Sequence, residues 1–406
     1  MRELRDMLRT GAYHQALSAL YPDVGAAVSR FERLNALWEA SREGEVRLYS
    51  SPGRTEIGGN HTDHNNGRVL AGAIHLDTIA LARKNDENVI RVRSAGFAPN
   101  RVDLDKPEDS KNSADRLILG ICDAFRQRGL PVGGFDAVTS SEVPPGSGLS
   151  SSAAFENLIC LILGDLYGGV VPEPVEMAKI GRYAENVFWQ KPSGLMDQMA
   201  GALGGLSLID FENPESPRVQ TVKSDFQGYT LFIAGPIGSH AGLSDEYAAI
   251  PREMKMAALA FGKETLRGVP PEEFFRAMPG LAIPERAALR AYHFLTENER
   301  AAAEAEALRR GDVAAFLDLV NASGRSSFMY LQNVVSGTRQ SLGVALAYSE
   351  TLLKGRGAQR VHGGGFAGTI QAFVPDDMAA AYQSAMTAAF GGCVAARIRE
   401  RGAARI

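Results

Sequence analysis

The chain has 406 residues, of which 45% are hydrophobic and 22% are charged, and its formal net charge at pH 7 is −4. This length allows two domains with large cores, and the composition is ordinary for a soluble globular protein. The slight acidity gives no reason to expect a nucleic acid or an anionic membrane as a partner. No apolar run reaches the ~18 residues that a membrane span requires.

The N-terminal segment and the cysteines indicate a cellular compartment. Residues 1–6 mix acidic and basic side chains and lack the apolar core of a signal peptide. Cys122, Cys160 and Cys393 are odd in number and far apart in the sequence. We therefore expect reduced core thiols in a cytoplasmic protein, and neither disulfides nor a zinc site.

The first part of the chain is predicted to form helices within residues 1–44 and a short strand at 46–49. Residues 51–67 are polar and rich in glycine, and apolar strands at 69–74 and 78–82 follow at once. An exposed loop is the simplest interpretation of such a stretch. A polar loop held between apolar strands is a good place for a functional site, and we favour that interpretation.

The sequence V-P-P-G-S-G-L-S-S-S-A-A-F-E at residues 143–156 lies between a predicted strand at 134–139 and a nearly all-apolar helix. Glycines let the backbone approach a ligand closely, and a helix N-terminus offers free N–H groups to an anion. A flexible linker is the alternative, but linkers do not usually join a strand to a buried helix. We therefore predict a phosphate-binding loop. It is not a Walker A loop, and a Rossmann fingerprint would need glycine at Ser151.

Further elements follow in order, with strands at 89–93, 205–211 and 229–234 and helices at 114–128 and 175–188. Asp197 is a lone carboxylate between Met196 and Met199, just after a Pro-Ser-Gly turn. Such a residue can be catalytic, or it can be an acidic side chain that the dipole favours at a helix N-terminus.

Proline and polar residues cluster at 212–228, which places a domain boundary there and predicts domains at 1–220 and 221–406. The second half is richer in helices, at 300–310, 313–321, 341–353 and 378–390, and Thr296–Glu299 resembles a capping box that opens the first of them. Residues 363–368 match G-x-G-x-x-G, but a strand at 369–374 follows where a dinucleotide site needs a helix.

Three separated motifs resemble those of the GHMP kinase superfamily, and specifically of the galactokinase family. Residues 53–65 are similar to the family's G-R-x-N-x-x-G-E-H-T-D-Y-N, residues 144–153 to its phosphate loop, and residues 363–368 to its C-terminal glycine motif. Segments at 184–198, 244–247 and 296–300 resemble A-E-H/N…G-I-M-D-Q, S-S-E-Y and T-E-N-x-R. The matches occur in the family's order over about residues 45–375.

The resemblance implies an α/β fold of two domains with the active site between them. It implies an ATP-dependent sugar kinase that phosphorylates the anomeric hydroxyl of galactose or a closely related sugar. Phosphoryl transfer depends on positioning and charge neutralisation, and Mg²⁺ is the implied metal because it prefers oxygen ligands. We expect only the sugar and ATP as partners, and a monomer or weak oligomer.

The same resemblance assigns roles to individual residues. Asp197 matches the carboxylate that accepts or orients the proton of the anomeric hydroxyl. Arg54 matches the cation that stabilises this carboxylate and the transferring phosphoryl group. Ser152 and Glu185 match the magnesium ligands. The implied sugar contacts are Asn60, His61, Asp63, Gly194 and Tyr247. The implied phosphate contacts are Pro145, Gly146, Ser147, Gly148, Leu149, Ser150, Ser151, Ser152, Gly364 and Gly365.

Several positions depart from the family pattern. Asn60 stands where the family has a glutamate that contacts the hydroxyl on the sixth carbon, Glu56 where it has asparagine, and His64 where it has tyrosine. Val361-His362 replaces a small polar lead-in to the third motif. Neutral hydrogen bonds are weaker than charge-assisted ones, so we expect relaxed selectivity at the sixth carbon. A rearrangement of Glu56 or His64 that restores the contact is the alternative.

Two other functions are compatible with the sequence. His61, Asp63 and His64 supply three quarters of the metal motif H-x-H-x-D-H, which would indicate a metal-dependent hydrolase, although Gly59 occupies the first histidine position. A catalytically inactive, sugar-sensing homologue is the other alternative, against which the retention of Arg54 and Asp197 argues.

Overall fold

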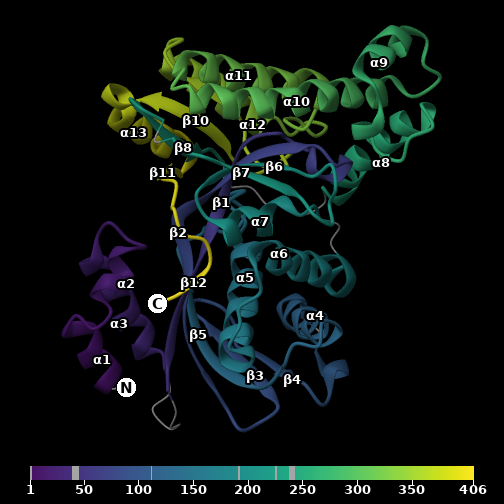
Figure 1. Ribbon diagram of the computed structural model, residues 1–406. Coiled ribbons are helices and arrows are strands. Elements are labelled where there is room, and N and C mark those ends of the chain that lie inside the picture. Colours follow the sequence, from purple (N-terminus) through teal and green to yellow (C-terminus); the bar gives the residue numbers. More distant parts are fainter. Residues whose placement is uncertain (1, 39–44, 111, 191–192, 225, 237–242) are drawn as a thin grey trace.

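The computed structural model describes residues 2–38, 45–110, 112–190, 193–224, 226–236 and 243–406. Two β-sheets, each covered by helices, are joined end to end (Figure 1). The first sheet extends from the bottom of the view to β6 and β7 below α10 and consists almost entirely of the first half of the chain, while the second sheet and its long helices lie at the top. The mixed α/β architecture that the sequence predicts is confirmed.

The first sheet has the strand order β12-β1-β2-β5-β3-β4, and β6 and β7 extend it from β2. All pairs are antiparallel except β3 with β5. The central strand β2 pairs with three neighbours, β1, β5 and β6. The strands are β1 (Arg47–Gly58), β2 (Arg68–Lys84), β3 (Val89–Ser94), β4 (Asn100–Asp103), β5 (Phe135–Ser141), β6 (Leu206–Asp210), β7 (Arg218–Val222) and β12 (Ala404–Arg405).

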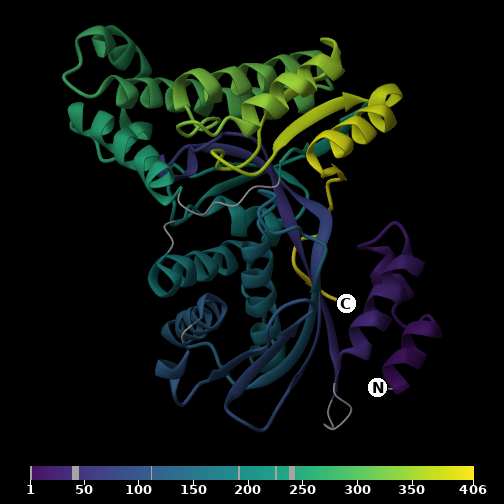
Figure 2. The same ribbon diagram turned by 180° about the vertical axis from the view of Figure 1, so that it is seen from behind.

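Helices cover both faces of this sheet, because alternate residues of its strands point to opposite sides. Leu81 packs in a cluster with the N-terminal helices, whereas its neighbour Ala80 packs with α4, α5 and α6. The two groups of helices lie on opposite sides of the sheet in Figure 1, and Figure 2 shows the same arrangement from behind. The helices are α1 (Arg2–Arg9), α2 (His14–Ser18), α3 (Val24–Ala36), α4 (Ser113–Gln127), α5 (Ser151–Leu163), α6 (Pro174–Tyr183) and α7 (Met196–Leu203).

The second sheet has the order β11-β8-β10-β9 and is antiparallel throughout. Phe232 packs with α12 and α13, and the next residue, Ile233, packs with α10 and α11, so helices cover this sheet on both faces as well. The elements are β8 (Tyr229–Ala234), α8 (Ser244–Ala260), α9 (Pro271–Ala277), α10 (Glu285–Arg309), α11 (Val313–Ser326), α12 (Ser341–Leu353), β9 (Ala358–Val361), β10 (Ile370–Pro375), α13 (Ala379–Phe390) and β11 (Cys393–Ala396).

The polar stretch that follows the first predicted strand differs from expectation. Residues 51–58, predicted as a loop, continue β1, and the strand absorbs register shifts at Pro52/Arg54 and Glu56/Gly58. The prediction was wrong because the polar side chains are buried against partners distant in sequence, such as Arg360 for Glu56. A polar strand of this kind cannot be recognised from alternation alone.

Two expectations for the second half also need correction. Thr296–Glu299 does not open a helix, because α10 runs without interruption from Glu285 to Arg309 and these residues lie in its middle. The domain boundary was predicted within the polar region at 212–228. This region contains β7, which pairs with β6 and therefore still belongs to the first sheet. In addition, β12 returns the C-terminus to β1, as the end of the chain beside β12 shows in Figure 1.

The buried helix and the thiols agree with the sequence analysis. Most of α5 is buried, and Cys122, Cys160 and Cys393 are buried free thiols. Residues 39–44 of the predicted N-terminal helical segment lie outside the described residues. Within the described part of the chain, no helix has both the length and the apolar character that crossing a membrane demands.

Candidate active site

The predicted phosphate loop connects β5 to α5 and is anchored by both halves of the chain. The Leu149 carbonyl accepts a hydrogen bond from the Arg54 amide at 3.1 Å, and the Ser147 carbonyl accepts one from Thr369 Oγ1 at 2.6 Å. Gly148 has a φ of 73°, and a Cβ there would lie 2.9 Å from His362 Nδ1. Because α5 begins directly at Ser151, the free N–H groups of its first turn open onto this loop.

Asp197 lies in the first turn of α7 and is held from two sides. Arg54 donates to its Oδ1 from Nε at 2.9 Å and from Nη2 at 2.6 Å, while Ser150 Oγ donates to its Oδ2 at 2.6 Å. Arg54 also donates from Nη1 to the Gly148 carbonyl. The Asp197 side chain is 35% exposed, whereas that of Arg54 is 6% exposed. A fixed carboxylate therefore opens to solvent directly beside the phosphate loop.

Ser152 and Glu185, the predicted metal ligands, lie together. Ser152 Oγ is 3.3 Å from Glu185 Oε1. Gln198 Nε2 donates to Glu185 Oε2 at 3.0 Å and to Glu156 Oε2 at 2.9 Å, which orients both carboxylates. Among the described residues no group of three or more His, Cys, Asp or Glu side chains could hold a metal ion. One hydroxyl and one carboxylate fit Mg²⁺, which usually relies on one or two carboxylates and on substrate phosphates.

The sugar loop, residues 59–67, follows β1 and contains the short helix η1 (Asp63–Asn65). A Cβ at Gly194 would lie 1.7 Å from Asp63 Oδ2, so glycine is needed there to leave room for that carboxylate. Burial, then the charge of Asp197 and then that of Glu56, raise the pKa of Asp63 to about 6. Asp63, Gly194 and Asp197 are thus brought together from positions far apart in the sequence.

The other predicted sugar contacts meet the third glycine motif. His61 Nε2 donates to the Gly364 carbonyl at 2.9 Å, and the Tyr247 hydroxyl donates to the Gly365 carbonyl at 2.5 Å. On its other side the motif approaches the phosphate loop, since a Cβ at Gly363 would lie 3.7 Å from the Gly148 carbonyl oxygen. The carbonyl groups of Gly364 and Gly365, residues predicted as phosphate contacts, therefore contact His61 of the sugar loop and Tyr247 of α8.

Asn60 is fully buried, with an exposed fraction of 0%. Its Nδ2 donates to Glu56 and to the Gly363 carbonyl, and its Oδ1 accepts from Ser327 and Asn333. Every hydrogen-bonding position of this amide is therefore occupied by the protein itself.

His61 and His64 do not form the metal cluster that the hydrolase alternative requires. Their rings are 3.4 Å apart between His61 Nδ1 and His64 Nε2. Burial lowers the pKa of His61 to about 4 and that of His64 to about 3, so both are neutral near pH 7. Among the described residues, these two histidines and Asp63 do not form a group of three side chains that could hold a metal ion.

Glu297, in the middle of α10, is a site residue that the sequence analysis placed in a capping box. Its Oε1 accepts from the amide of Gly59 at 3.1 Å, from that of Asn60 at 3.3 Å and from Ser323 Oγ at 2.6 Å. Burial raises the pKa of this carboxyl, but the charge of Arg300 and the further groups around it outweigh burial and lower the pKa to about 2. The T-E-N-x-R motif was the sequence signal that could have identified this residue. In the structure, the Glu297 carboxylate binds the backbone amides at the start of the sugar loop and so acts as a clamp on that loop.

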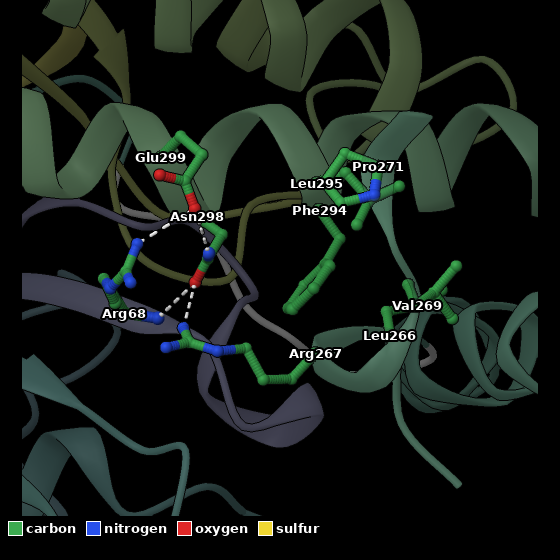
Figure 3. Close-up of a pocket in the computed structure, with 9 residues that line it drawn as sticks. All are labelled: Arg68, Leu266, Arg267, Val269, Pro271, Phe294, Leu295, Asn298 and Glu299. Carbon is green, nitrogen blue, oxygen red and sulfur yellow. Dashed lines mark hydrogen bonds and ion pairs between the residues drawn. The ribbon is translucent and has the colours of Figure 1, made fainter. Parts of the chain in front are cut away.

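A cavity of about 100 Å³ lies on the other side of this clamp (Figure 3). Asn298 Oδ1 accepts from the Arg68 amide and from Arg267 Nη1, each at 2.9 Å, and Arg68 Nη1 donates to Glu299 at 2.9 Å. The polar side chains that line the cavity point toward one another in Figure 3. The cavity shares no residue with the predicted site, and its network holds the start of β2 against α10.

Comparison with known proteins first defines the class. Residues 116–205 match the GHMP kinases N terminal domain, and residues 39–84 match the galactokinase galactose-binding signature. The structure superposes on the mevalonate kinase of Methanococcus jannaschii with a TM-score of 0.63 at 14% identity, covering 88% of this chain and 99% of that one. The fold is thus that of the GHMP kinases.

Relatives with higher identity define the family. The galactokinase of Actinobacillus pleuropneumoniae serotype 5b (strain L20) is 32% identical over 339 residues, which cover 80% of this chain and 84% of that protein. The Lactococcus lactis galactokinase structure, complexed with galactose, aligns with a TM-score of 0.81 at 25% identity, covering 94% of this chain and 100% of that one. The chain belongs to the galactokinase family, whose members are ATP-dependent sugar kinases.

Proposed function

We propose that this protein transfers the γ-phosphoryl group of ATP to the anomeric hydroxyl of galactose or a closely related sugar. The observation that carries the proposal is the Asp197 carboxylate, which Arg54 and Ser150 hold beside the phosphate loop. The relatives named galactokinase, one of them solved with galactose, support this choice of substrate.

Asp197 accepts, or at least orients, the proton of the attacking hydroxyl. Two nitrogen atoms of Arg54 and the hydroxyl of Ser150 fix the carboxylate, so the sugar meets a base whose orientation is already set. Arg54 carries a permanent positive charge and lies against Gly148, where it can also stabilise negative charge on the transferring phosphoryl group.

The loop from Pro145 to Ser152 binds the ATP phosphates through backbone N–H groups and serine hydroxyls. Gly364 and Gly365 contact the phosphates from the other side of the site. Ser152 and Glu185 would hold Mg²⁺, which neutralises phosphate charge when bound. The sugar side is formed by His61, Asp63, Gly194 and Tyr247.

The units predicted at 1–220 and 221–406 supply most of the two lobes between which the substrates bind, although β7 crosses this boundary and β12 belongs to the first sheet. The protein is proposed to be a cytoplasmic monomer or weak oligomer, in keeping with its three buried free thiols.

A coupled ADP-release assay with a panel of sugars tests the function. We expect turnover with galactose that depends on ATP and Mg²⁺ and yields the sugar 1-phosphate by phosphorus NMR. Purified Asp197→Asn protein is the control for contaminating kinases. Binding of galactose without any ADP release would instead favour the inactive, sugar-sensing homologue.

A further inference from the structure

The third glycine motif is held by residues predicted to contact the sugar. The carbonyl oxygens of Gly363, Gly364 and Gly365 accept hydrogen bonds from Asn60 Nδ2 at 2.7 Å, His61 Nε2 at 2.9 Å and the Tyr247 hydroxyl at 2.5 Å. Three consecutive peptide groups of one loop are thus fixed by side chains of the sugar loop and of α8. The position of this loop and the positions of His61 and Tyr247 depend on one another.

Asn60 differs from His61 and Tyr247 in its surroundings. Both of the latter are only partly buried, but Asn60 is 0% exposed. Its Nδ2 also donates to Glu56 Oε1 at 3.0 Å, and its Oδ1 accepts from Asn333 Nδ2 at 2.8 Å and Ser327 Oγ at 3.2 Å. No donor or acceptor of this amide remains for a sugar hydroxyl.

Glu56, the partner of Asn60, is itself bound to a buried cation. Arg360 pairs with the Glu56 carboxylate and donates to the Ile57 carbonyl at 2.8 Å and to the Val361 carbonyl at 3.0 Å. The Arg360 side chain is 0% exposed. Because Arg360 lies on β9, just before the third glycine motif, the three side chains join β1 to that motif across the two sheets.

We propose that Asn60 is a positioning residue and that the buried network Glu56–Asn60–Arg360 sets the third glycine motif against the sugar loop. The proposal rests on the sugar kinase function proposed above. Asn60 acts on the sugar through His61 and Tyr247, and it does not read the hydroxyl on the sixth carbon. The buried amide is therefore not the cause of relaxed selectivity there.

The first test compares two sugars that differ only at the sixth carbon, galactose and 6-deoxygalactose. Asn60→Asp keeps the size of the side chain but removes both donors and places a carboxylate beside Glu56. We expect kcat/KM to fall by at least about tenfold for both sugars, mainly through a higher KM for the sugar, with their ratio unchanged within about twofold. A tenfold change in the ratio would mean that residue 60 contacts the sixth carbon, and normal kinetics with both sugars would remove its positioning role.

The second test is a double-mutant cycle that couples residue 60 to its partner. Glu56→Gln removes the charge repulsion that Asn60→Asp creates. The kcat/KM of the double variant should therefore be several-fold higher than the product of the two single effects predicts. Asn65→Asp is the matched control, since this buried amide of the same loop bonds to His64 and to the Leu266 amide and does not contact Glu56. Its effect should simply multiply with that of Glu56→Gln.

The same cycle measured by urea unfolding is independent of turnover. We expect coupling in the unfolding free energy between residues 56 and 60, and none between residues 56 and 65. If the wild-type protein does not phosphorylate galactose but the coupling is present, the proposed substrate is wrong and the network stands. If galactose is phosphorylated and the coupling is absent in both assays, the network is wrong.

Discussion

The proposed phosphate side and the proposed sugar side of this site are built in different ways. The proposed phosphate loop is one continuous stretch between a strand and a helix, with glycines at positive φ, a buried Ser147 and partly buried serines at 150–152. The sugar side collects Asp63, Gly194, Tyr247 and the third glycine motif from four distant parts of the chain. Asp63 and Tyr247 are partly buried, whereas the polar side chains of Glu56 and Asn60 behind them are buried and bound to each other.

This difference shows how the two substrates can be recognised. Phosphate binding needs N–H groups and close approach of the backbone, which a short local sequence can provide. Placing sugar contacts requires side chains with fixed neighbours, and here those neighbours come from both sheets. Substitutions on the phosphate side should therefore change catalysis directly. Substitutions on the sugar side should also shift the neighbouring side chains of the buried network.

The largest effect is expected where the two sides meet, at Asp197. Asp197→Asn keeps the shape but removes the charge that accepts or orients the proton, so kcat should fall by roughly 10²–10⁴-fold. Affinity for ATP, measured by calorimetry without sugar, should stay close to that of the wild type. Turnover near the wild-type level would exclude Asp197 from the mechanism.

Arg54→Lys comes next in expected size. Arginine contacts the Asp197 carboxylate with two nitrogen atoms and Gly148 with the third, and a lysine ammonium cannot make this fork. We expect kcat to fall by about 10²-fold, the cost typical for the loss of one preorganised donor. Steady-state kinetics at saturating ATP measure this, and full activity would assign Arg54 a purely electrostatic role.

A pH profile sharpens the comparison, since the sugar side has a carboxyl that titrates near neutrality. The pKa of Asp63 is raised to about 6, so the group is ionised above that pH and protonated below it. If the ionised form binds the sugar, kcat/KM for galactose should fall about tenfold per pH unit below about 6. In Asp63→Asn this fall should vanish from the residual activity, and its persistence would assign the titration to another group.

The smallest effect concerns stability behind the sugar loop. Glu304 on α10 is buried beside Gly58, and neither carboxyl oxygen has a hydrogen-bond partner among the described residues. Burial, and then the charge of Glu297, raise its pKa well above the ordinary 4.5. Its stabilising contribution is therefore full below about pH 4.5 and is lost as the pH rises through the folded-state pKa.

Glu304→Gln removes this titration. Urea unfolding at pH 5 and pH 8 should show the wild type losing about 1–3 kcal/mol relative to the variant over that range. The phosphate side should be insensitive, so KM for ATP should not differ between the two proteins. Equal pH dependence in both would show that Glu304 has a partner and titrates normally.

Much of the fold, and the grouping of several candidate site residues, could be predicted from the sequence. Hydrophobic periodicity located most elements, such as β8, β10 and α12, because a helix or strand that packs by one face shows its period locally. The phosphate loop was equally visible, since its glycines, its serines and the helix behind them are contiguous. Arg54, Asp197, Ser152 and Glu185 were named from motifs, and the structure brings them together as pairs.

Only the tertiary structure decided what the buried polar residues do. The stretch from residue 51 to 58 looked like a loop because its polar side chains have partners hundreds of residues away, among them Arg360 and His362. Glu297 looked like part of a helix cap, although it binds the amides of Gly59 and Asn60. Asn60 looked like a sugar contact, although all its hydrogen bonds are made within the protein. A sequence pattern reports local period and chemistry, while the partner that satisfies a buried polar group is chosen by the packing of the whole chain.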